Sequence, residues 1–253
     1  MDLREKDGKG KGAANRHPWE LSRTGRVLGV LAGYLDRKSE NSGRRYVNIG
    51  AGDLYFDNRL LGKYEGDRAY AVDLEYDEQV PDYPRVEKFH YLEEVPGEMD
   101  YAIMMDSLEY MPDDAAYLKA LSGKVKEGGY LFFTLPALQS VFSEHDRIVG
   151  NLRRYNVRGF RKLAAAVPGL EVVECQYFYT CLLLIRYLQV CLHLRIDRER
   201  KVTSGWKYSE RNPLTRCMVW FLNIDFAVNR ALSKIGIRLP GLSLLVVCRK
   251  EKP

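Results

Sequence analysis

The chain has 253 residues, of which 46% are hydrophobic and 29% are charged, and its formal net charge is +5. This composition supplies enough apolar side chains for a sizeable core, and it excludes a disordered or low-complexity chain. The length suits one α/β domain with an insertion. The five cysteines are odd in number and form no C-x-x-C pair, which argues against a disulfide scaffold or a zinc site. With no apolar leader at the start, we expect a cytoplasmic protein without a metal centre.

The first part of the chain predicts a tail followed by a helix. Residues 1–16 are polar and rich in glycine and lysine, so we expect a disordered tail there. From Trp19 to about Tyr34 the apolar residues recur with helical spacing. This helix belongs to the predicted core, residues 17–179, and a polar link over 37–45 leads from it to the first strand.

Strand and helix patterns then alternate along the core. A helix over 113–126 begins after Pro112 and is expected to end at the pair Gly128-Gly129. The expected strands cover 45–49, 69–74, 86–89, 100–105, 130–135, 170–179 and 242–249. Strands separated by helices indicate a mostly parallel, seven-stranded, Rossmann-like α/β sheet with helices on both faces.

A long insertion separates the last two strands. Residues 180–240 have a mostly helical pattern, and 241–253 hold the last strand and a short tail. The insertion contains apolar helical stretches at 179–194 and 213–232, joined by a basic sequence with Trp206 and Tyr208. Such a cap could be a substrate lid, a homodimer interface or an interfacial membrane patch, and these alternatives stay open.

Positive charge is concentrated in the second half of the chain. From Arg147 to Arg216 there are 14 Lys and Arg residues against 5 Asp and Glu residues, an excess of 14 − 5 = +9. An excess of this kind favours an anionic partner, such as a phosphorylated acceptor, nucleic acid or the inner face of an anionic membrane. The longest apolar tract, 178–194, contains Arg186 and is too short for a membrane span.

A glycine turn after the first strand predicts an adenosine ligand. The strand Val47-Asn48-Ile49 runs into Gly50-Ala51-Gly52-Asp53, and a G-x-G turn lets a ligand approach the backbone. In open α/β sheets, ligands bind beyond the carboxyl ends of the strands. The second strand ends at Asp73, 21 residues after Gly52, a spacing that suits a carboxylate binding the ribose hydroxyls.

The residues of the turn discriminate between adenosine cofactors. A nicotinamide fingerprint requires a third glycine where Tyr55 stands, and Asp53 would repel a diphosphate. An acidic turn suits the cationic sulfonium of S-adenosyl-L-methionine better. A nicotinamide-dependent oxidoreductase is therefore disfavoured.

In their order along the chain, these motifs resemble the class I S-adenosylmethionine-dependent methyltransferases of the bacterial methyltransferase-domain group. The matching segments are VNIGAGD (47–53), AYAVD (69–73), MDYAIMMDSLEYMPDD (99–114) and VKEGGYLFFTLP (125–136). The resemblance covers most of residues 17–180. It implies methyl transfer from S-adenosyl-L-methionine and the strand order 3-2-1-4-5-7-6 with strand 7 antiparallel. The cofactor site would be lined by Asn48, Gly50, Ala51, Gly52, Asp53, Asp73, Leu74, Asp106 and Ser107.

Three positions depart from the family's pattern. Asn48 stands where an acid is usual, Leu54 where a further glycine is common, and Tyr110 where a histidine is common. Asp53 is the residue that could replace the missing acid. A non-catalytic scaffold or binding protein with this fold therefore remains an alternative.

Residues after the fifth strand are candidates for the acceptor side of the site. His145 is followed by Asp146, and a histidine of near-neutral pKa beside a carboxylate suits proton removal from an acceptor. Arg153, Arg154 and Tyr155 suit an anionic group. The block SEHDRIVGNLRRY (143–155) resembles family members that accompany cell-surface glycan or lipid enzymes. We expect transfer to an oxygen of a small, glycan or lipid-linked anionic acceptor, with a nucleic-acid methyltransferase as an alternative.

Overall fold

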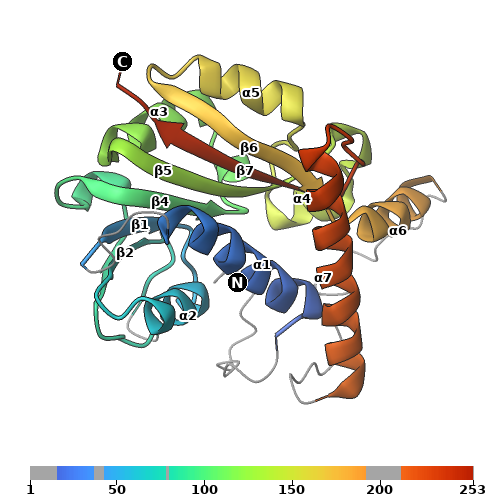
Figure 1. The fold of residues 1–253 in the computed structure, drawn as a ribbon, viewed down its shortest axis with the longest axis horizontal. Helices are drawn as coiled ribbons and strands as arrows, with labels where there is room; N and C mark the ends of the chain where they lie inside the picture. The colour runs from blue at the N-terminus through green and yellow to red at the C-terminus, as the bar shows by residue number, and fades with distance from the viewer. Residues whose placement is uncertain (1–15, 37–42, 78–79, 192–211, 253) are drawn as a thin grey trace.

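The computed structural model describes residues 16–36, 43–77, 80–191 and 212–252. The strands of this part of the chain form one sheet in the order β3-β2-β1-β4-β5-β7-β6 (Figure 1). They are β1 (Arg45–Ile49), β2 (Arg68–Val72), β3 (Val86–Phe89), β4 (Met99–Met105), β5 (Val125–Pro136), β6 (Leu170–Phe178) and β7 (Ser243–Lys250). β7 is antiparallel to β5 and β6, and the other neighbours pair in parallel. The predicted fold class and strand order are confirmed.

Helices cover both faces of this sheet (Figure 1). They are α1 (Pro18–Leu35), α2 (Tyr55–Lys63), α3 (Asp114–Lys124), α4 (Glu144–Val149), α5 (Val157–Ala165), α6 (Thr180–Cys191) and α7 (Pro213–Lys234). On one face, α3 and α5 bury Leu118 and Phe160 against the strands. On the other face, α1, α2 and α7 bury Leu31, Leu60 and Phe226. Because side chains alternate along a strand, each central strand contributes to both cores.

The boundary between α3 and β5 differs from the prediction. The helix ends at Lys124 and the strand begins at Val125, so Gly128-Gly129 lies inside β5 and does not end the helix. A side chain at Gly129 would meet the backbone carbonyl oxygen of Asp100 at 2.7 Å. The pairing of β4 with β5 also shifts register nearby. Glycine is therefore required here because the two backbones pass closely at an irregular point of the ladder.

The insertion between β6 and β7 contains α6 and α7, as predicted, while 192–211, with Trp206 and Tyr208, lies outside the described residues. β5 and β6 both run antiparallel to β7, so β6 runs in the same direction as the central strands. It follows that α6 begins at the carboxyl edge of the sheet. The Asp225 carboxylate of α7 accepts hydrogen bonds from the backbone N–H groups of Thr180 (3.1 Å) and Cys181 (2.9 Å), and thereby caps α6.

The lengths and compositions of the helices bear on membrane insertion. Among the described residues, none of them combines the length and the apolar character that a transmembrane span needs.

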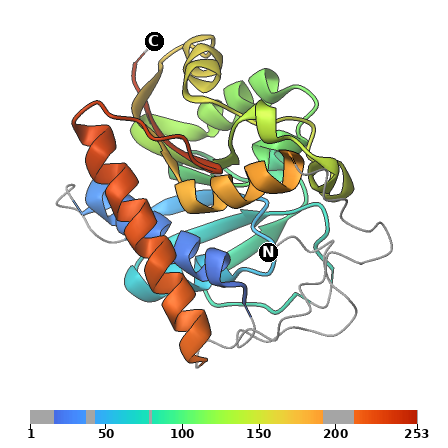
Figure 2. The ribbon, with the colours of Figure 1, turned by 90° about the vertical axis from the view of Figure 1, so that its right-hand side faces the viewer.

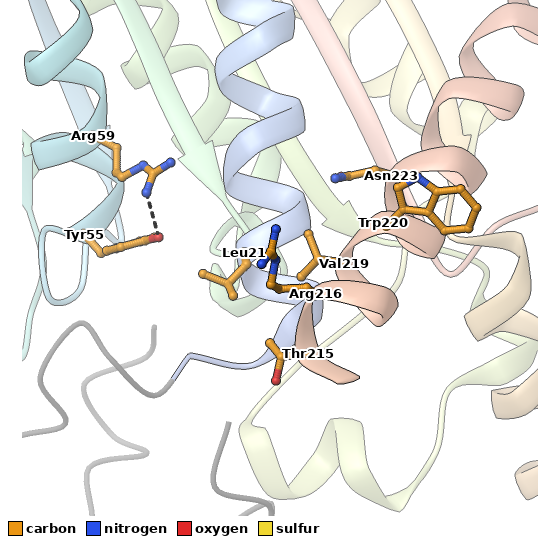
Figure 3. A pocket seen from close by; sticks show the side chains of 8 residues that line it. All are labelled: Leu21, Tyr55, Arg59, Thr215, Arg216, Val219, Trp220 and Asn223. Atoms are coloured by element: carbon orange, nitrogen blue, oxygen red, sulfur yellow. Dashed lines mark hydrogen bonds between the residues drawn. The ribbon is translucent and has the colours of Figure 1, made fainter. Parts of the chain in front are cut away.

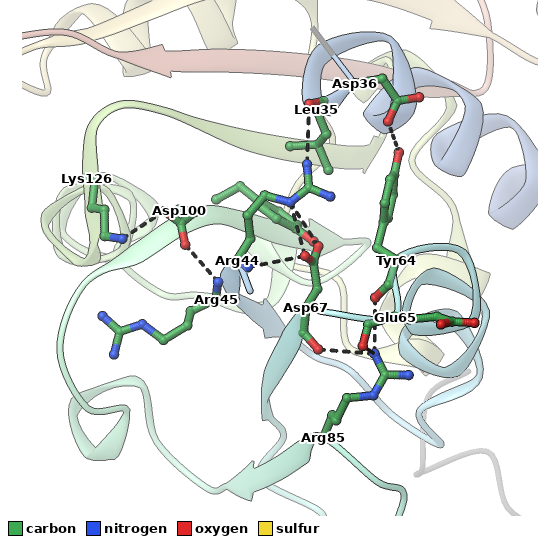
Figure 4. Close-up of polar contacts among 11 residues, drawn as sticks. Leu35, Asp36, Arg44, Arg45, Tyr64, Glu65, Asp67, Arg85, Asp100 and Lys126 are labelled. Atoms are coloured by element: carbon green, nitrogen blue, oxygen red, sulfur yellow. Dashed lines mark hydrogen bonds and ion pairs between the residues drawn. The ribbon is translucent and has the colours of Figure 1, made fainter. Parts of the chain in front are cut away.

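A polar cluster lies at the amino edge of the sheet (Figure 4), and its members Arg44, Asp67 and Tyr101 are buried. The Arg44 guanidinium pairs with Asp67, with 3.1 Å between Nε and Oδ2, and the Tyr101 hydroxyl donates to the same carboxylate at 3.1 Å. The Arg85 guanidinium donates to the carbonyl oxygen of Tyr64 at 3.1 Å. These contacts tie the loops before β1, β2 and β3 together, so this cluster serves the fold.

Candidate functional site

The turn after β1 brings bare backbone to the carboxyl edge of the sheet. Gly50 and Gly52 have φ angles of +66° and +58°, which glycine adopts without strain. The Gly50 amide donates to the carbonyl oxygen of Val72 at 2.8 Å, so the turn is fastened to the end of β2. A Cβ at Gly50 would overlap the side chain of Ser107, which follows β4. The loops after β1 and β4 therefore meet at this point.

Asp73, at the end of β2, holds the other side of the turn. Its Oδ2 accepts a hydrogen bond from the Gly52 amide at 2.9 Å, and its Oδ1 accepts one from the Glu75 amide at 3.0 Å. Each oxygen of a carboxylate can accept a further hydrogen bond. The neighbouring Leu74 side chain is 56% exposed. A partly exposed carboxylate beside an exposed apolar side chain and a bare glycine turn has the chemistry that a ribose and an adenine require.

Arg16 connects the start of the chain to this turn. Its guanidinium pairs with both Asp53 and Glu20 and lies 3.7 Å from the centroid of the Tyr55 ring. The sequence predicts a disordered tail over 1–16; of these residues the structure describes only Arg16, and Arg16 is buried.

A second arginine of the same segment reaches the loop after β4. Arg23, on α1, is buried and pairs with Asp106, whose φ angle is +48°. The Thr134 hydroxyl of β5 donates to the same carboxylate at 3.2 Å. Sequence reasoning missed the roles of Arg16 and Arg23. No local signal in the sequence points to these roles, because each ion pair joins segments that are far apart along the chain.

Two of the departures from the family pattern find a structural explanation. The side-chain amide of Asn48 donates to Asp57 of α2 at 2.9 Å, and both side chains are buried under that helix. Burial raises the pKa of Asp57 to about 6. Leu54 has a φ angle of +63° and is fully buried. Packing of its side chain offsets a backbone strain of roughly 1–2 kcal/mol that glycine would avoid.

The predicted pair His145-Asp146 lies at the start of α4, and the two side chains have different surroundings. The Asp146 carboxylate is fully buried and pairs with Arg154 at 2.7 Å. It also accepts hydrogen bonds from the Ser143 amide at 2.8 Å and the Asn151 side chain at 3.1 Å. Burial lowers the pKa of His145, and the nearby Arg186 lowers it further.

Arg153 and Tyr155 share one partner. The Arg153 guanidinium lies 3.0 Å from the Asp114 carboxylate, and the Tyr155 hydroxyl donates to the same group at 2.9 Å. Arg154 points elsewhere and donates to the Ala137 carbonyl oxygen at 3.0 Å. The three residues thus join the loop after α4 to α3 and β5, and their part in acceptor binding stays a prediction.

Glu109 was not singled out from the sequence. It lies just after Ser107, and its side chain is only 1% exposed. Burial, the dominant cause, raises the pKa of this carboxyl to about 8, although Arg23 and Arg154 oppose the shift. Its Oε2 atom has no hydrogen-bond partner among the described residues. The loop after β4 therefore contains a buried carboxyl group whose protonated form is favoured by burial.

Comparisons with known proteins place the core of the chain in a sequence family. Residues 24–181 match the sequence model of a family described as a methyltransferase domain. No curated protein sequence matches the chain.

Three solved structures illustrate the likeness in fold. A proposed sarcosine dimethylglycine methyltransferase from Galdieria sulphuraria is 18% identical, with a TM-score of 0.55 over 91% of this chain and 86% of that one. Phosphoethanolamine N-methyltransferase 2 from Haemonchus contortus, in complex with S-adenosyl-L-methionine, is 14% identical, with a TM-score of 0.54 over 90% and 53%. The [4+2]-cyclase SpnF is 14% identical, with a TM-score of 0.55 over 98% and 86%. At these identities the likeness shows the fold.

Proposed function

Given that the chain belongs to the methyltransferase-domain family, whose cofactor is S-adenosyl-L-methionine, we propose that Asp73 and the Gly50–Gly52 turn hold this cofactor for methyl transfer. The observation that carries the proposal is the position of the Asp73 carboxylate, fixed by the Gly52 and Glu75 amides at the carboxyl edge of the sheet. Its remaining lone pairs accept hydrogen bonds from the ribose hydroxyls. Leu74 and Ala51 supply apolar contact beside it.

The charges around the turn complement the amino-acid end of the same cofactor. That end carries an ammonium and a carboxylate next to the cationic sulfur. Asp53 and Asp106 complement the cationic groups, and Arg16 and Arg23 complement the carboxylate, since all four residues meet at this edge in two ion pairs. Charge-assisted hydrogen bonds of this kind are about twice as strong as neutral ones.

His145 is the residue we propose for proton removal from the acceptor. When bound, the cofactor supplies an electrophilic methyl group on its sulfur. An acceptor hydroxyl that took this methyl group, with S-adenosylhomocysteine as the leaving group, would lose its proton to a ring nitrogen of His145. The lowered pKa of His145 keeps the imidazole neutral and able to accept a proton near pH 7.

The acceptor we propose is an oxygen of a small, glycan or lipid-linked molecule that carries an anionic group. The partly exposed Arg153 is the residue best placed to contact such a group, because Arg154 is buried against Asp146. Tyr155 supports Arg153 through their common partner, Asp114. Guanidinium groups bind carboxylate and phosphate in a bidentate manner.

Calorimetric titration with S-adenosyl-L-methionine tests the cofactor site. Asp73→Ala removes hydrogen bonds worth roughly 1.5–3 kcal/mol each, so the dissociation constant should rise by about tenfold or more. The matched control is Asp82→Ala, because the Asp82 side chain is 91% exposed and outside the site. Absence of heat with the wild-type protein, or equal affinity of the folded Asp73→Ala variant, would refute the proposal.

A further inference from the structure

The outer faces of α6 and α7 expose an unusual amount of apolar surface. On α6, Leu184, Ile185 and Leu188 are each more than half exposed. On α7 the exposed apolar residues are spaced alternately by three and four positions, and Trp220, 63% exposed, lies beside them. This stripe consists of Leu214, Cys217, Phe221, Ile224, Val228, Ala231 and Ile235. The spacing places all seven residues along one side of the helix.

The stripe on α7 is not the side that packs on the domain. Thr215, Leu222, Phe226 and Asn229 are the buried residues of this helix, and Leu222 and Phe226 belong to the core that it forms with α1 and the sheet. Figure 2 looks onto the side of the molecule where α6 and α7 both lie in front of the sheet. Apolar patches of this kind on a protein surface mark sites of interaction.

The charges on this side have one sign. In the described part of α6, in α7 and in residues 235–240, the exposed charged residues are Arg216, Lys234 and Arg238. The single acid of α7, Asp225, is turned inward and caps α6. A second copy of the chain would place basic residues against the same basic residues. An anionic lipid surface complements them, and each basic residue near such a surface contributes roughly 1 kcal/mol.

A pocket of about 330 Å³ lies at one border of this side, between α1, α2 and α7 (Figure 3). Arg59 and Arg216 line it together with Tyr55 and Trp220. Among the described residues, neither arginine has a carboxylate partner. Two arginines beside the exposed ring of Trp220 and the half-buried ring of Tyr55 form a suitable binding site for a lipid phosphate at the level of the headgroups.

The orientation of the sheet connects this surface with the cofactor edge. α6 starts where β6 ends, and β6 runs in the direction of β1 and β4. Tyr55, in the pocket, is the first residue of α2 and follows the glycine turn directly. The apolar side and the carboxyl edge of the sheet therefore border each other.

We propose that the outer faces of α6 and α7 dock on the surface of an anionic bilayer, with Arg59 and Arg216 at the lipid phosphates. The contact is interfacial: the apolar stripe enters the headgroup region while the helices remain parallel to the surface. The role of this docking rests on the proposed function: in this orientation the carboxyl edge of the sheet, with the cofactor, faces a lipid-linked acceptor.

Co-sedimentation of the full chain with vesicles tests the docking surface. The wild-type protein should sediment with phosphatidylcholine vesicles that contain phosphatidylglycerol, less with pure phosphatidylcholine, and less at high salt. The double substitution Phe221→Glu/Ile224→Glu should reduce binding by about tenfold or more, since it places two carboxylates within the stripe. Its control, Ala165→Glu/Val173→Glu, adds the same charge at exposed residues of α5 and β6 and should bind like the wild type.

A second pair of variants removes charge without touching the apolar stripe. Arg59→Ser/Arg216→Ser should weaken binding to the anionic vesicles severalfold, whereas Arg158→Ser/Arg161→Ser, which removes the same charge from the exposed side of α5, should not. Equal sedimentation of each variant and its control would overturn the proposal, as would a wild-type protein that stays in the supernatant. So would light scattering showing a dimer that Phe221→Glu/Ile224→Glu converts to a monomer. Calorimetry with S-adenosyl-L-methionine should be unchanged in all four variants, which separates a failed docking surface from a failed cofactor site.

Discussion

At the scale of single residues, Gly50 has two constraints, a positive φ angle and contact with Ser107, so any side chain there disturbs the loops after β1 and β4 together. Asp73 also has two roles, because its carboxylate fixes the turn and retains lone pairs for a ligand. The site is therefore built mainly from backbone and from short acidic side chains.

Alanine substitutions at Gly50, in the turn, and at Gly62, in α2, should have opposite effects on stability. Gly50→Ala should lower the free energy of unfolding by about 1–3 kcal/mol and abolish cofactor binding, because of backbone strain and the overlap with Ser107. Gly62 lies in α2 with open space around an added methyl group. Gly62→Ala should therefore raise the free energy of unfolding by up to about 1 kcal/mol, because alanine favours the helix more than glycine does. Thermal unfolding and calorimetry measure both effects, and a Gly50→Ala protein as stable as Gly62→Ala would contradict this account of the turn.

Glu109 should make stability depend on pH. Its pKa is raised from 4.5 to about 8, so the native state holds a proton that the unfolded chain releases at lower pH. The stabilisation is complete below about pH 4.5 and is lost as the pH rises through about 8. Between these two pH values the native state binds more protons than the unfolded state, so raising the pH favours unfolding.

The variant Glu109→Gln isolates this contribution. It should be more stable than the wild type at pH 8, by on the order of 2 kcal/mol, and should differ little at pH 5. Denaturant unfolding at the two pH values measures the difference. An equal effect of the substitution at both pH values would mean that the Glu109 carboxyl does not titrate in this range.

At the scale of elements, α6 depends on α7 for its amino terminus. Asp225→Ala removes the cap and should destabilise the protein by about 1 kcal/mol. Hydrogen exchange should become faster in the first turn of α6, at Thr180 and Cys181, while the amides of β1 and β4 keep their protection. Unchanged exchange in α6 would show that packing alone holds this helix.

The elements also show which features a sequence can reveal. α1 and α7 have long apolar periodicity, and they were predicted within a few residues. α2 was missed because Leu54, in a left-handed conformation, provides no side-chain cap before it. The Gly128-Gly129 pair has the sequence pattern of a helix end. Its actual reason, the close approach of Gly129 to Asp100 of the neighbouring strand, is a tertiary contact that the sequence does not show. Local patterns predict elements well until a tertiary contact decides the conformation.

At the scale of the whole molecule, the strand order and the antiparallel β7 came from resemblance to a family, because periodicity does not encode them. The turn residues and Asp73 were recognisable because their spacing is local. The ion pairs of Arg16 with Asp53 and of Arg23 with Asp106 join distant segments, and spacing within the sequence could not predict them. The same limit applies to Asp146, which follows His145 in sequence but pairs with Arg154.

A crystal structure of the full chain with S-adenosylhomocysteine tests the central claim most directly. We predict that the ribose hydroxyls lie about 2.5–3.0 Å from the Asp73 carboxylate oxygens, with the adenine against Leu74 and the amino-acid end among Asp53, Asp106, Arg16 and Arg23. Binding of the ligand elsewhere on the molecule, or with its ribose away from Asp73, would contradict the account.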